Sequence, residues 1–260
     1  MDRLVVIDEL IAALGDDAVR CGDAVDMRYR ADWSGAAPVL PLALLRPSST
    51  EQVSAALRIC HTHRVAVVPQ RGLTGLAGGA MPQADAVSLS LERMNAIEQV
   101  DTLAATITVQ AGATLQAVQE AALAQGMVFG VDLGARGSCQ IGGNLATNAG
   151  GNGVMQYGMM REQVLGLEVV MADGTVRPML KNNTGYDLKH WFIGSEGTLG
   201  VITRTLLVLR SAPNARVSTL VALPDYASAI HLLRRLLAAC PGALAAFELM
   251  WDDFYITSLR

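Results

Sequence analysis

One stretch in the middle of the chain concentrates residues that could bind an anionic ligand. Residues 131–151 read Val-Asp-Leu-Gly-Ala-Arg-Gly-Ser-Cys-Gln-Ile-Gly-Gly-Asn-Leu-Ala-Thr-Asn-Ala-Gly-Gly. Glycine permits positive φ and close approach of a ligand to main-chain N–H groups, and successive amides in such turns bind anions. A flexible loop is the alternative, but a solvated linker would not carry the apolar residues Leu133, Ile141 and Leu145. We therefore predict a ligand cradle here.

A second glycine-rich turn follows a predicted strand. Residues 69–82 read Pro-Gln-Arg-Gly-Leu-Thr-Gly-Leu-Ala-Gly-Gly-Ala-Met-Pro, directly after the apolar run Val65-Ala-Val-Val68. Phosphate-binding loops commonly occupy this place. However, the turn lacks the Gly-x4-Gly-Lys-Ser/Thr pattern, and no Gly-x-Gly-x-x-Gly opens a helix after it. A P-loop NTPase and a Rossmann dinucleotide site are therefore both poor fits.

The elements that must position these turns predict an α+β architecture with a ligand between two subdomains. Residues 40–68 form a β-α-β unit, which favours parallel pairing of its two strands, and a capping box at 48–51 opens its helix. Asp173-Gly174 predicts a hairpin. The expected helices are 3–14, 51–63, 114–123 and 225–240, and the expected strands are 40–45, 65–68, 86–91, 97–100, 105–110, 163–171, 175–179, 201–209 and 217–222, with another element starting at 247–251.

The bulk composition is that of a globular protein without a nucleic-acid or membrane signature. The 260 residues are 51% hydrophobic and 17% charged, with a net charge of −4. A chain of this balance has no basic surface for nucleic acid, and no apolar run reaches the length of a membrane span. Acidic residues interrupt the N-terminus, unlike a signal peptide. The four widely spaced cysteines favour reduced thiols, and we expect a cytoplasmic protein.

Three motifs together resemble the flavin domain of the vanillyl-alcohol oxidase and p-cresol methylhydroxylase superfamily. They are residues 69–82, 131–151 and 192–202. Residues 132–151, together with the runs at 164–175 and 183–189, are most similar to the D-2-hydroxyglutarate and D-lactate dehydrogenase branch. The resemblance implies a two-subdomain PCMH-type FAD-binding fold followed by the start of a ferredoxin-like substrate (cap) domain. It divides the chain into an N-terminal helical segment (1–37), an FAD-binding domain (38–212, with subdomains of about 38–100 and 101–212) and an incomplete cap (213–260).

The resemblance also implies which residues hold FAD. Arg71 could add charge to the phosphate cradle, with a solvated loop arginine as the alternative, and Glu196 could be a binding residue or an exposed turn acid. The implied residues are Pro69, Arg71, Gly72, Leu73, Thr74, Gly75 and Leu76 around the pyrophosphate, Asp132, Leu133, Ser138, Ile141, Gly142, Gly143, Asn144, Ala146, Thr147, Gly150 and Gly151 on the phosphate–ribityl–flavin path, and Glu196, Gly197, Gly200, Val201 and Ile202 around the adenosine half.

By the same resemblance, the activity is oxidation of a 2-hydroxy acid to a 2-oxo acid by hydride transfer to flavin N5, with a separate electron acceptor. The catalytic residues and the His and Glu metal ligands of that branch lie beyond the matched part, so catalytic residues stay unknown and no metal ligand is assigned. The histidines at 61, 63, 190 and 231 do not match those ligands. The turn at 69–82 has no histidine for a covalent link, and Cys139 stands where this branch has a residue that does not link flavin, so noncovalent FAD is expected.

Two other functions stay open. The chain could be a non-catalytic FAD-binding subunit or fragment that needs a partner chain for substrate binding, or it could bind a phosphate ligand without flavin. An unfinished cap should also expose apolar faces over residues 217–251, which favours a homo-oligomer or a chain that supplies the rest of the cap.

Overall fold

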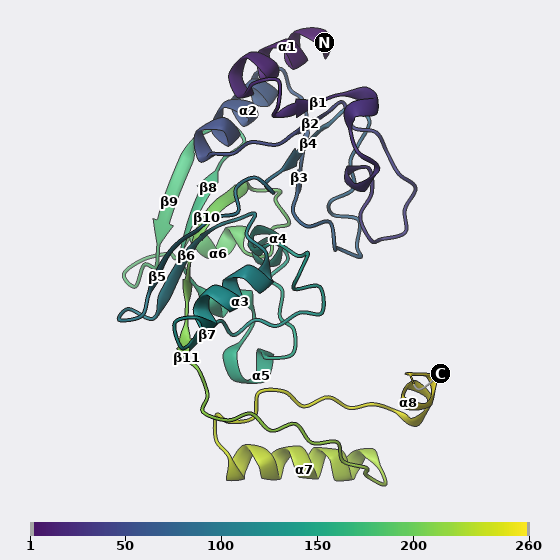
Figure 1. Ribbon diagram of the computed structural model, residues 1–260, viewed down its shortest axis with the longest axis vertical. Coiled ribbons are helices and arrows are strands. Elements are labelled where there is room, and N and C mark those ends of the chain that lie inside the picture. Colours follow the sequence, from purple (N-terminus) through teal and green to yellow (C-terminus); the bar gives the residue numbers. More distant parts are fainter. Residues whose placement is uncertain (1–2, 259–260) are drawn as a thin grey trace.

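Two β-sheets form the body of the protein, and a C-terminal segment extends away from it. The computed structural model describes residues 3–258 (Figure 1). Helices and strands alternate irregularly along the chain, with one mainly parallel sheet and one antiparallel sheet. The predicted α+β class is confirmed.

The first sheet has the strand order β1-β2-β4-β3, in which β2, β4 and β3 run parallel. α1 and α2 pack against each other beside it, and Val6 and Leu10 of α1 are fully buried. β1 pairs antiparallel with β2, so the first forty residues contribute to this sheet. Its elements are α1 (Arg3–Leu14), β1 (Val19–Arg20), the 3₁₀ turns Gly22–Ala24 and Met27–Tyr29, β2 (Ala43–Leu45), α2 (Thr50–Thr62), β3 (Val67–Gln70) and β4 (Val87–Ser90).

The expectation that the two strands of the β-α-β unit pair with each other is wrong. β4 lies between β2 and β3 and pairs in parallel with both. Every residue of β4 is buried, so the chain places this strand at the centre of the sheet, where it satisfies the ladder hydrogen bonds of both neighbours. α2 begins one residue later than the predicted capping box, with Ser49 as the N-cap that accepts a hydrogen bond from the Gln52 amide at 3.3 Å.

The second sheet is antiparallel, in the order β5-β6-β10-β8-β9. β10 is its central strand and contributes Val201, Ile202 and Leu207 to the core. The hairpin of β8 and β9 turns at Asp173-Gly174, as predicted. The strands are β5 (Ile97–Asp101), β6 (Thr106–Gln110), β8 (Val164–Val170), β9 (Val176–Leu180) and β10 (Val201–Val208), and a separate pair is made by β7 (Met127–Val128) and β11 (Arg210–Ser211).

Short helices connect these strands and lie on the side of the sheet nearest the glycine-rich turns (Figure 1). α3 begins after Thr114, whose hydroxyl accepts from the Ala117 amide at 3.2 Å, as predicted. α4 arises within the central glycine-rich stretch and is buried on most of its residues. The helices are α3 (Leu115–Leu123), α4 (Ile141–Ala146), α5 (Val154–Tyr157), α6 (Lys189–Phe192) and the 3₁₀ turn Met160–Gln163.

The chain after β11 has little packing of its own. α7 (Tyr226–Ala239) starts at the predicted place, capped by Asp225, but residues 217–223 form no strand. That prediction is wrong because a strand requires a partner edge, and the described part of the chain offers none there. α8 (Asp252–Ser258) begins just after the predicted element at 247–251.

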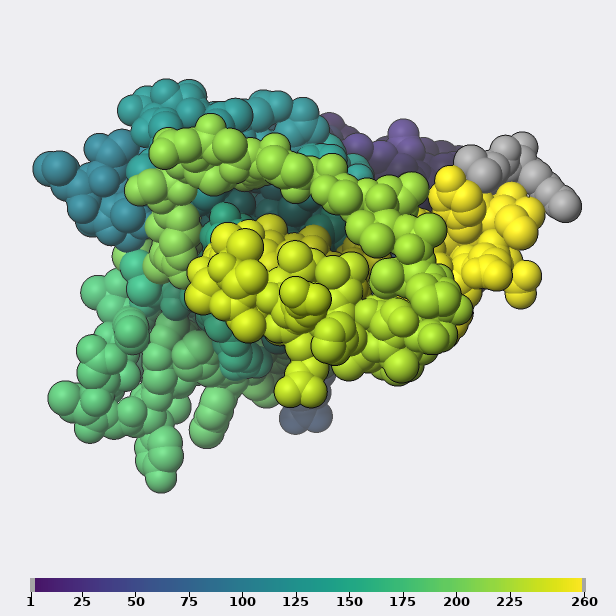
Figure 2. Space-filling model, turned by 90° about the horizontal axis from the view of Figure 1, so that it is seen from below, coloured from purple at the N-terminus to yellow at the C-terminus, as the bar shows by residue number. Residues whose placement is uncertain are grey.

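The expected exposure of apolar side chains in this region is confirmed. The exposed fraction is 70% for Leu220 and 61% for Trp251, and α7 buries Ala229 alone among its residues. Figure 2 shows the segment crossing the lower face of the molecule as a separate ridge. A hydrogen bond of 2.8 Å joins it to the body, from Gln156 Nε2 to the Gly242 carbonyl.

No helix among residues 3–258 is both long and apolar enough to cross a lipid bilayer.

Candidate functional site

The turn after β3 presents a row of free backbone amides. The amides of residues 72–76 donate no hydrogen bond to any acceptor in the described part of the chain. Gly72 and Leu73 both have positive φ, 71° and 57°, which turns their N–H groups out of the sheet direction. Leu73 is not a glycine, so its conformation is strained. Successive amides held in this way form a concave donor set for an anion such as phosphate. We call residues 69–82 the phosphate turn.

Arg71, at the start of this turn, is a buried cation without a partner. Its side chain is 9% exposed, and neither Nε nor Nη2 has a hydrogen-bond partner among the described residues. Burial lowers the pKa of the guanidinium to about 10. The alternative of a solvated loop arginine is therefore wrong. An unpaired buried charge is costly, and an anion beside it would offset that cost.

Close packing joins this turn to the central stretch. A Cβ on Gly72 would lie 2.4 Å from the Ser138 carbonyl oxygen, and a Cβ on Gly142 would lie 2.7 Å from Cδ of Arg71. A Cβ on Gly143 would meet the Arg71 carbonyl oxygen at 3.2 Å. These glycines are required because backbone and arginine stem occupy the space of a side chain. The two glycine-rich motifs, far apart in the sequence, thus form one structure.

The third motif packs on the other end of α4. The Gly194 amide donates to the Leu145 carbonyl at 3.0 Å, and the Glu196 amide donates to the Ala146 carbonyl at 2.8 Å. Glu196 has a φ of 54°, and its Oε2 would lie 2.8 Å from a Cβ on Gly79 of the turn. Strained conformations at Glu196 and in the phosphate turn therefore face a common region, which is typical of a ligand site.

Where the central stretch forms α4, its first amides are already used in hydrogen bonds. The Ile141 amide donates to the Ala113 carbonyl at 2.9 Å, and the Gly142 amide donates to the Ala111 carbonyl at 2.7 Å. The Gly143 amide donates to the Gln140 carbonyl. At α4 the glycines therefore serve close approach to Arg71, while the amides of Gly134, Ala135, Gly137, Gly150 and Gly151 donate to no acceptor within residues 3–258. The anion nest expected in residues 131–151 stays a prediction.

The other predicted residues lie around this centre or behind it. Asp132 and Gly151 form a backbone bridge, and the Asn152 amide donates to the Asp132 carbonyl at 3.0 Å. Gly200, Val201 and Ile202 lead into β10, where the side chains face the core, so a ligand could reach only their backbone. The predicted residues fall into four groups by their surroundings. The segments that contact one another at the phosphate turn and α4 contain Pro69, Arg71, Gly72, Leu73, Thr74, Gly75, Leu76, Ser138, Gly142, Gly143, Ala146, Glu196 and Gly197. The backbone bridge contains Asp132, Leu133, Gly150 and Gly151, the buried positions are Ile141, Asn144, Val201 and Ile202, and Thr147 lies at the exposed end of α4.

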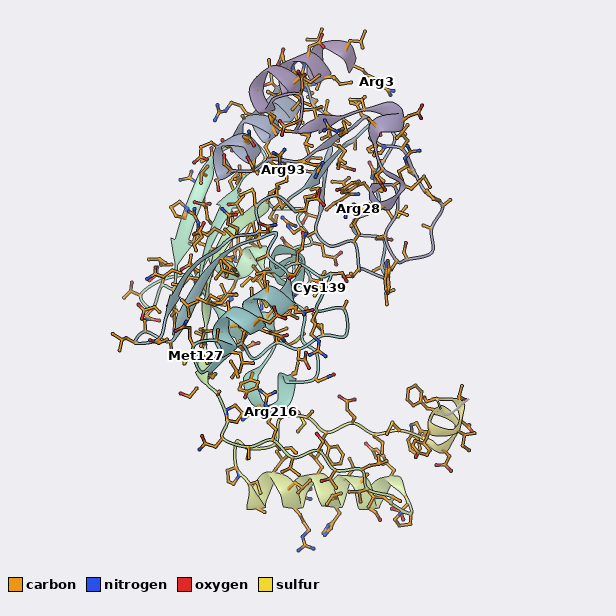
Figure 3. The ribbon with its side chains drawn as sticks, viewed as in Figure 1. Arg3, Arg28, Arg93, Met127, Cys139 and Arg216 are labelled. Atoms are coloured by element: carbon orange, nitrogen blue, oxygen red, sulfur yellow. The ribbon has the colours of Figure 1, made fainter. Side chains whose placement is uncertain are left out.

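A cavity of about 560 Å³ opens beside the phosphate turn, bordered by the predicted residues Gly72, Leu73 and Ser138 and by others, such as Tyr29, Asp32 and Gln70, that were not among the predicted site residues. The region lies between Arg28 and Cys139, which are labelled in Figure 3. The sequence showed only a polar, irregular stretch before residue 35, so no motif marked its part in the cavity. The lining includes Tyr29, Asp32, Trp33, Gln70, Leu73, Ser90, Thr114, Ser138 and Gln140.

Near α6, a second polar cluster contains His190. Lys189 is 1% exposed and forms an ion pair with Asp187, and its Nζ lies 3.3 Å from Nε2 of His190. Burial and the neighbouring Lys189 charge lower the pKa of His190. Within residues 3–258, no group of three or more His, Cys, Asp and Glu residues has an arrangement that could hold a metal ion.

Comparison with known proteins assigns the family. Residues 41–179 match the family described as FAD binding domain. This range covers more than half of the chain, so the protein belongs to the FAD binding domain family, and its cofactor is FAD.

Curated relatives and a solved structure are similar to the chain over most of its length. The chain is 44% identical over 223 residues to the mitochondrial D-2-hydroxyglutarate dehydrogenase of Bos taurus, covering 84% of this chain and 41% of that protein. It is 44% identical over 230 residues to the D-2-hydroxyglutarate dehydrogenase of Xanthomonas citri pv. viticola, covering 86% of this chain and 48% of that protein. An alkyldihydroxyacetonephosphate synthase structure shares the fold at a TM-score of 0.79 and 23% identity, over 91% of this chain and 46% of its own. The chain thus spans less than half the length of these proteins.

The residues present fit FAD. A pyrophosphate carries negative charge on oxygens that accept hydrogen bonds, and the turn at 72–76 provides free donors next to the unpaired charge of Arg71. The glycines at 142 and 143 keep bulk away from that charge.

Proposed function

We propose that this chain is the flavin-binding half of an FAD-dependent dehydrogenase for D-2-hydroxy acids. The observation that carries the proposal is the buried, unpaired Arg71 beside the free amides of residues 72–76, in a chain that resembles D-2-hydroxyglutarate dehydrogenases over most of its length. For this proposal the FAD-binding domain spans 38–212, with subdomains of about 38–100 and 101–212, and residues 213–260 begin the cap.

The chain's own residues hold and orient the cofactor. The amides of residues 72–76 and the Arg71 guanidinium bind the pyrophosphate, and the segment from Glu196 to Ile202 lies beside the adenosine half. The central stretch from Asp132 to Gly151 lines the flavin side. When bound, FAD supplies the hydride acceptor, so that a 2-hydroxy acid loses the hydride on Cα and the hydroxyl proton and becomes a 2-oxo acid.

We further propose that FAD is held without a covalent bond. Cys139 is 3% exposed and lies behind Gly72 and Asn144, and burial raises the pKa of its thiol, which disfavours the thiolate. The turn at 69–82 carries no histidine that could form a link.

Two partners complete the proposed reaction: a small 2-hydroxy acid and an electron acceptor. D-2-Hydroxyglutarate is the first substrate to test, because it is in the names of two relatives at 44% identity. D-Lactate is the second. The exposed apolar side chains of residues 217–258 support association with a second copy or with a chain that completes the cap.

A non-catalytic role is the second candidate. The described residues bring together no metal-binding group, and the polar cluster at Lys189 is an internal ion pair. In this alternative the chain binds FAD and depends on another chain for substrate binding and proton transfer.

The compartment stays a prediction. The cysteines at 21, 60, 139 and 240 are all free, which suits a reducing compartment such as the cytoplasm. The Bos taurus relative is mitochondrial by name, and a matrix location would suit free thiols equally. Fractionation of the source cells would separate the two.

The test is anaerobic reduction of the FAD-loaded chain. D-2-Hydroxyglutarate or D-lactate is added and the flavin absorbance near 450 nm is followed, with the L-enantiomers as controls. Bleaching by the D-form alone supports a dehydrogenase. If the loaded chain stays yellow, the candidate C-terminal half of a relative is added, and bleaching only in the mixture means that this flavin-binding half depends on another chain for substrate binding and proton transfer. Failure to bleach in both experiments would contradict the proposed activity.

A further inference from the structure

The cavity beside the phosphate turn contains three buried oxygen acceptors without donors. Asp32 Oδ2, Gln70 Oε1 and Gln140 Oε1 have no hydrogen-bond partner within residues 3–258. The three side chains are 8%, 1% and 9% exposed, and all three residues line the same cavity. Buried acceptors without partners are rare in folded proteins because each loses its hydration without compensation.

The assignment of these oxygens follows from their neighbours. Gln70 Nε2 donates to the carbonyls of Tyr29 at 2.9 Å and Ala80 at 3.1 Å, which fixes Oε1 as the free end of the amide. Asp32 Oδ1 accepts from the Ser34 amide at 3.0 Å, which leaves Oδ2 as its free oxygen. Gln140 is the N-cap residue of α4, but its side chain makes no capping hydrogen bond.

Residues 27–33 hold one wall of this cavity against the phosphate turn. The Trp33 amide donates to the Gly75 carbonyl at 3.0 Å, and the Asp32 amide lies 3.3 Å from the Met81 sulfur. Nearby, Glu92 is already neutralised by Arg28 and Arg46, so the carboxylate of Asp32 is the uncompensated charge of the cavity. These contacts tie the wall to the turn, and Gly72 and Leu73 line the same cavity as the three acceptors.

We infer that this cavity takes the hydroxyl-bearing ribityl chain of FAD, with Asp32, Gln70 and Gln140 as acceptors. The inference rests on the proposed function, because it assumes the pyrophosphate at residues 72–76. Two polyhydroxylated segments flank a bound pyrophosphate: the ribityl chain with three hydroxyls and the adenosine ribose with two. Three free acceptors match the ribityl chain. The adenosine segment from Glu196 to Ile202 contributes no residue to the lining, within the described chain.

The test compares FAD affinity in variants that keep the fold. Asp32→Asn keeps Oδ1 for the Ser34 amide and replaces the acceptor Oδ2 with an amide NH₂, which is a donor. Gln140→Met removes the acceptor and keeps the length of the side chain. Each is expected to raise the Kd for FAD, measured by quenching of flavin fluorescence, by about tenfold, because a charged or buried acceptor is removed. Asp16→Asn, at an exposed position outside the cavity, is the control and should leave the Kd unchanged.

Deoxy analogues of FAD identify the segment. With an analogue that lacks a ribityl hydroxyl, the difference between wild type and Asp32→Asn or Gln140→Met should shrink for at least one variant. With an analogue that lacks a ribose hydroxyl, the difference should stay at about tenfold. Shrinkage with the ribose analogue instead would overturn the inference, and so would wild-type affinity for FAD in both variants. Absence of FAD binding by the wild-type chain would overturn the proposed function as well.

Discussion

Replacing Arg71 with methionine should stabilise the chain without FAD and weaken its binding of FAD. The guanidinium is buried and unpaired, and burial lowers its pKa to about 10. That shift corresponds to about 3 kcal/mol of penalty on the charged form at neutral pH. The methionine side chain can occupy the space of the arginine stem beside Gly142, and it carries no charge. The penalty should be recovered, and the Tm of the apoprotein should rise by about 6–12 °C.

The effect on the loaded protein has the opposite sign. A charged hydrogen bond to the pyrophosphate contributes about 1.5–3 kcal/mol, so the Kd for FAD should rise by roughly 10-fold to 100-fold in Arg71→Met. Thermal unfolding with and without FAD measures both effects, and Arg177→Met, at an exposed position of β9, is the matched control. If the Arg71→Met apoprotein were less stable than the wild type, the guanidinium would have an internal partner and the reasoning would be refuted.

Three further changes test other parts of the site and fold. Gly142→Ala should cost about 1–3 kcal/mol and lower FAD affinity, because its Cβ would meet Arg71 and Ala111 at 2.7 and 2.8 Å. The control Gly185→Ala, at an exposed position outside the site where the nearest atom is Asn182 Nδ2 at 3.4 Å, should preserve stability and affinity, and equal effects of the two changes in denaturant titrations would contradict this. Ser49→Ala should lower the unfolding free energy by about 1 kcal/mol through loss of the α2 cap, and an unchanged urea midpoint would count against it. The pKa of His190 is lowered in the folded state, so its contribution to stability is present above pH 6.5 and is lost as the pH falls through the folded-state pKa. In His190→Gln, the Tm should therefore fall less than in the wild type between pH 7 and pH 5. An equal fall of the Tm in both proteins would refute this.

Much of the fold was predictable because local patterns determine it. Thr114, Gly174 and Asp225 mark a helix cap, a hairpin turn and another helix cap through short-range chemistry, and the structure has each of them. The order of strands in the first sheet was not predictable in this way. β4 enters between β2 and β3 although β2 is as fully buried as β4, so local burial patterns do not reveal which strand is central, and the order depends on the whole chain. The prediction of a strand at 217–222 was wrong for the same reason, since pairing requires a partner edge that no local pattern reveals.

The site shows the same division between local and distant causes. The glycines at 72, 142 and 143 predicted close backbone approach, and the structure has it. Which amides stay free depended on the carbonyls of Ala111 and Ala113, which lie just past the end of β6. The burial of Arg71 depends on α4 covering it. The acceptor at Asp32 carried no sequence signal, because only the fold brings residues 27–33 beside the phosphate turn.

The most direct test of the central claim is the flavin content of the purified chain. The protein is purified or reconstituted with FAD, its absorbance spectrum is recorded, and it is then denatured and separated from small molecules. The account predicts about one FAD per chain, released entirely on denaturation, and an intact protein mass that equals the sequence mass. A chain that binds no FAD at tens of micromolar, or a protein mass increased by a flavin, would contradict it.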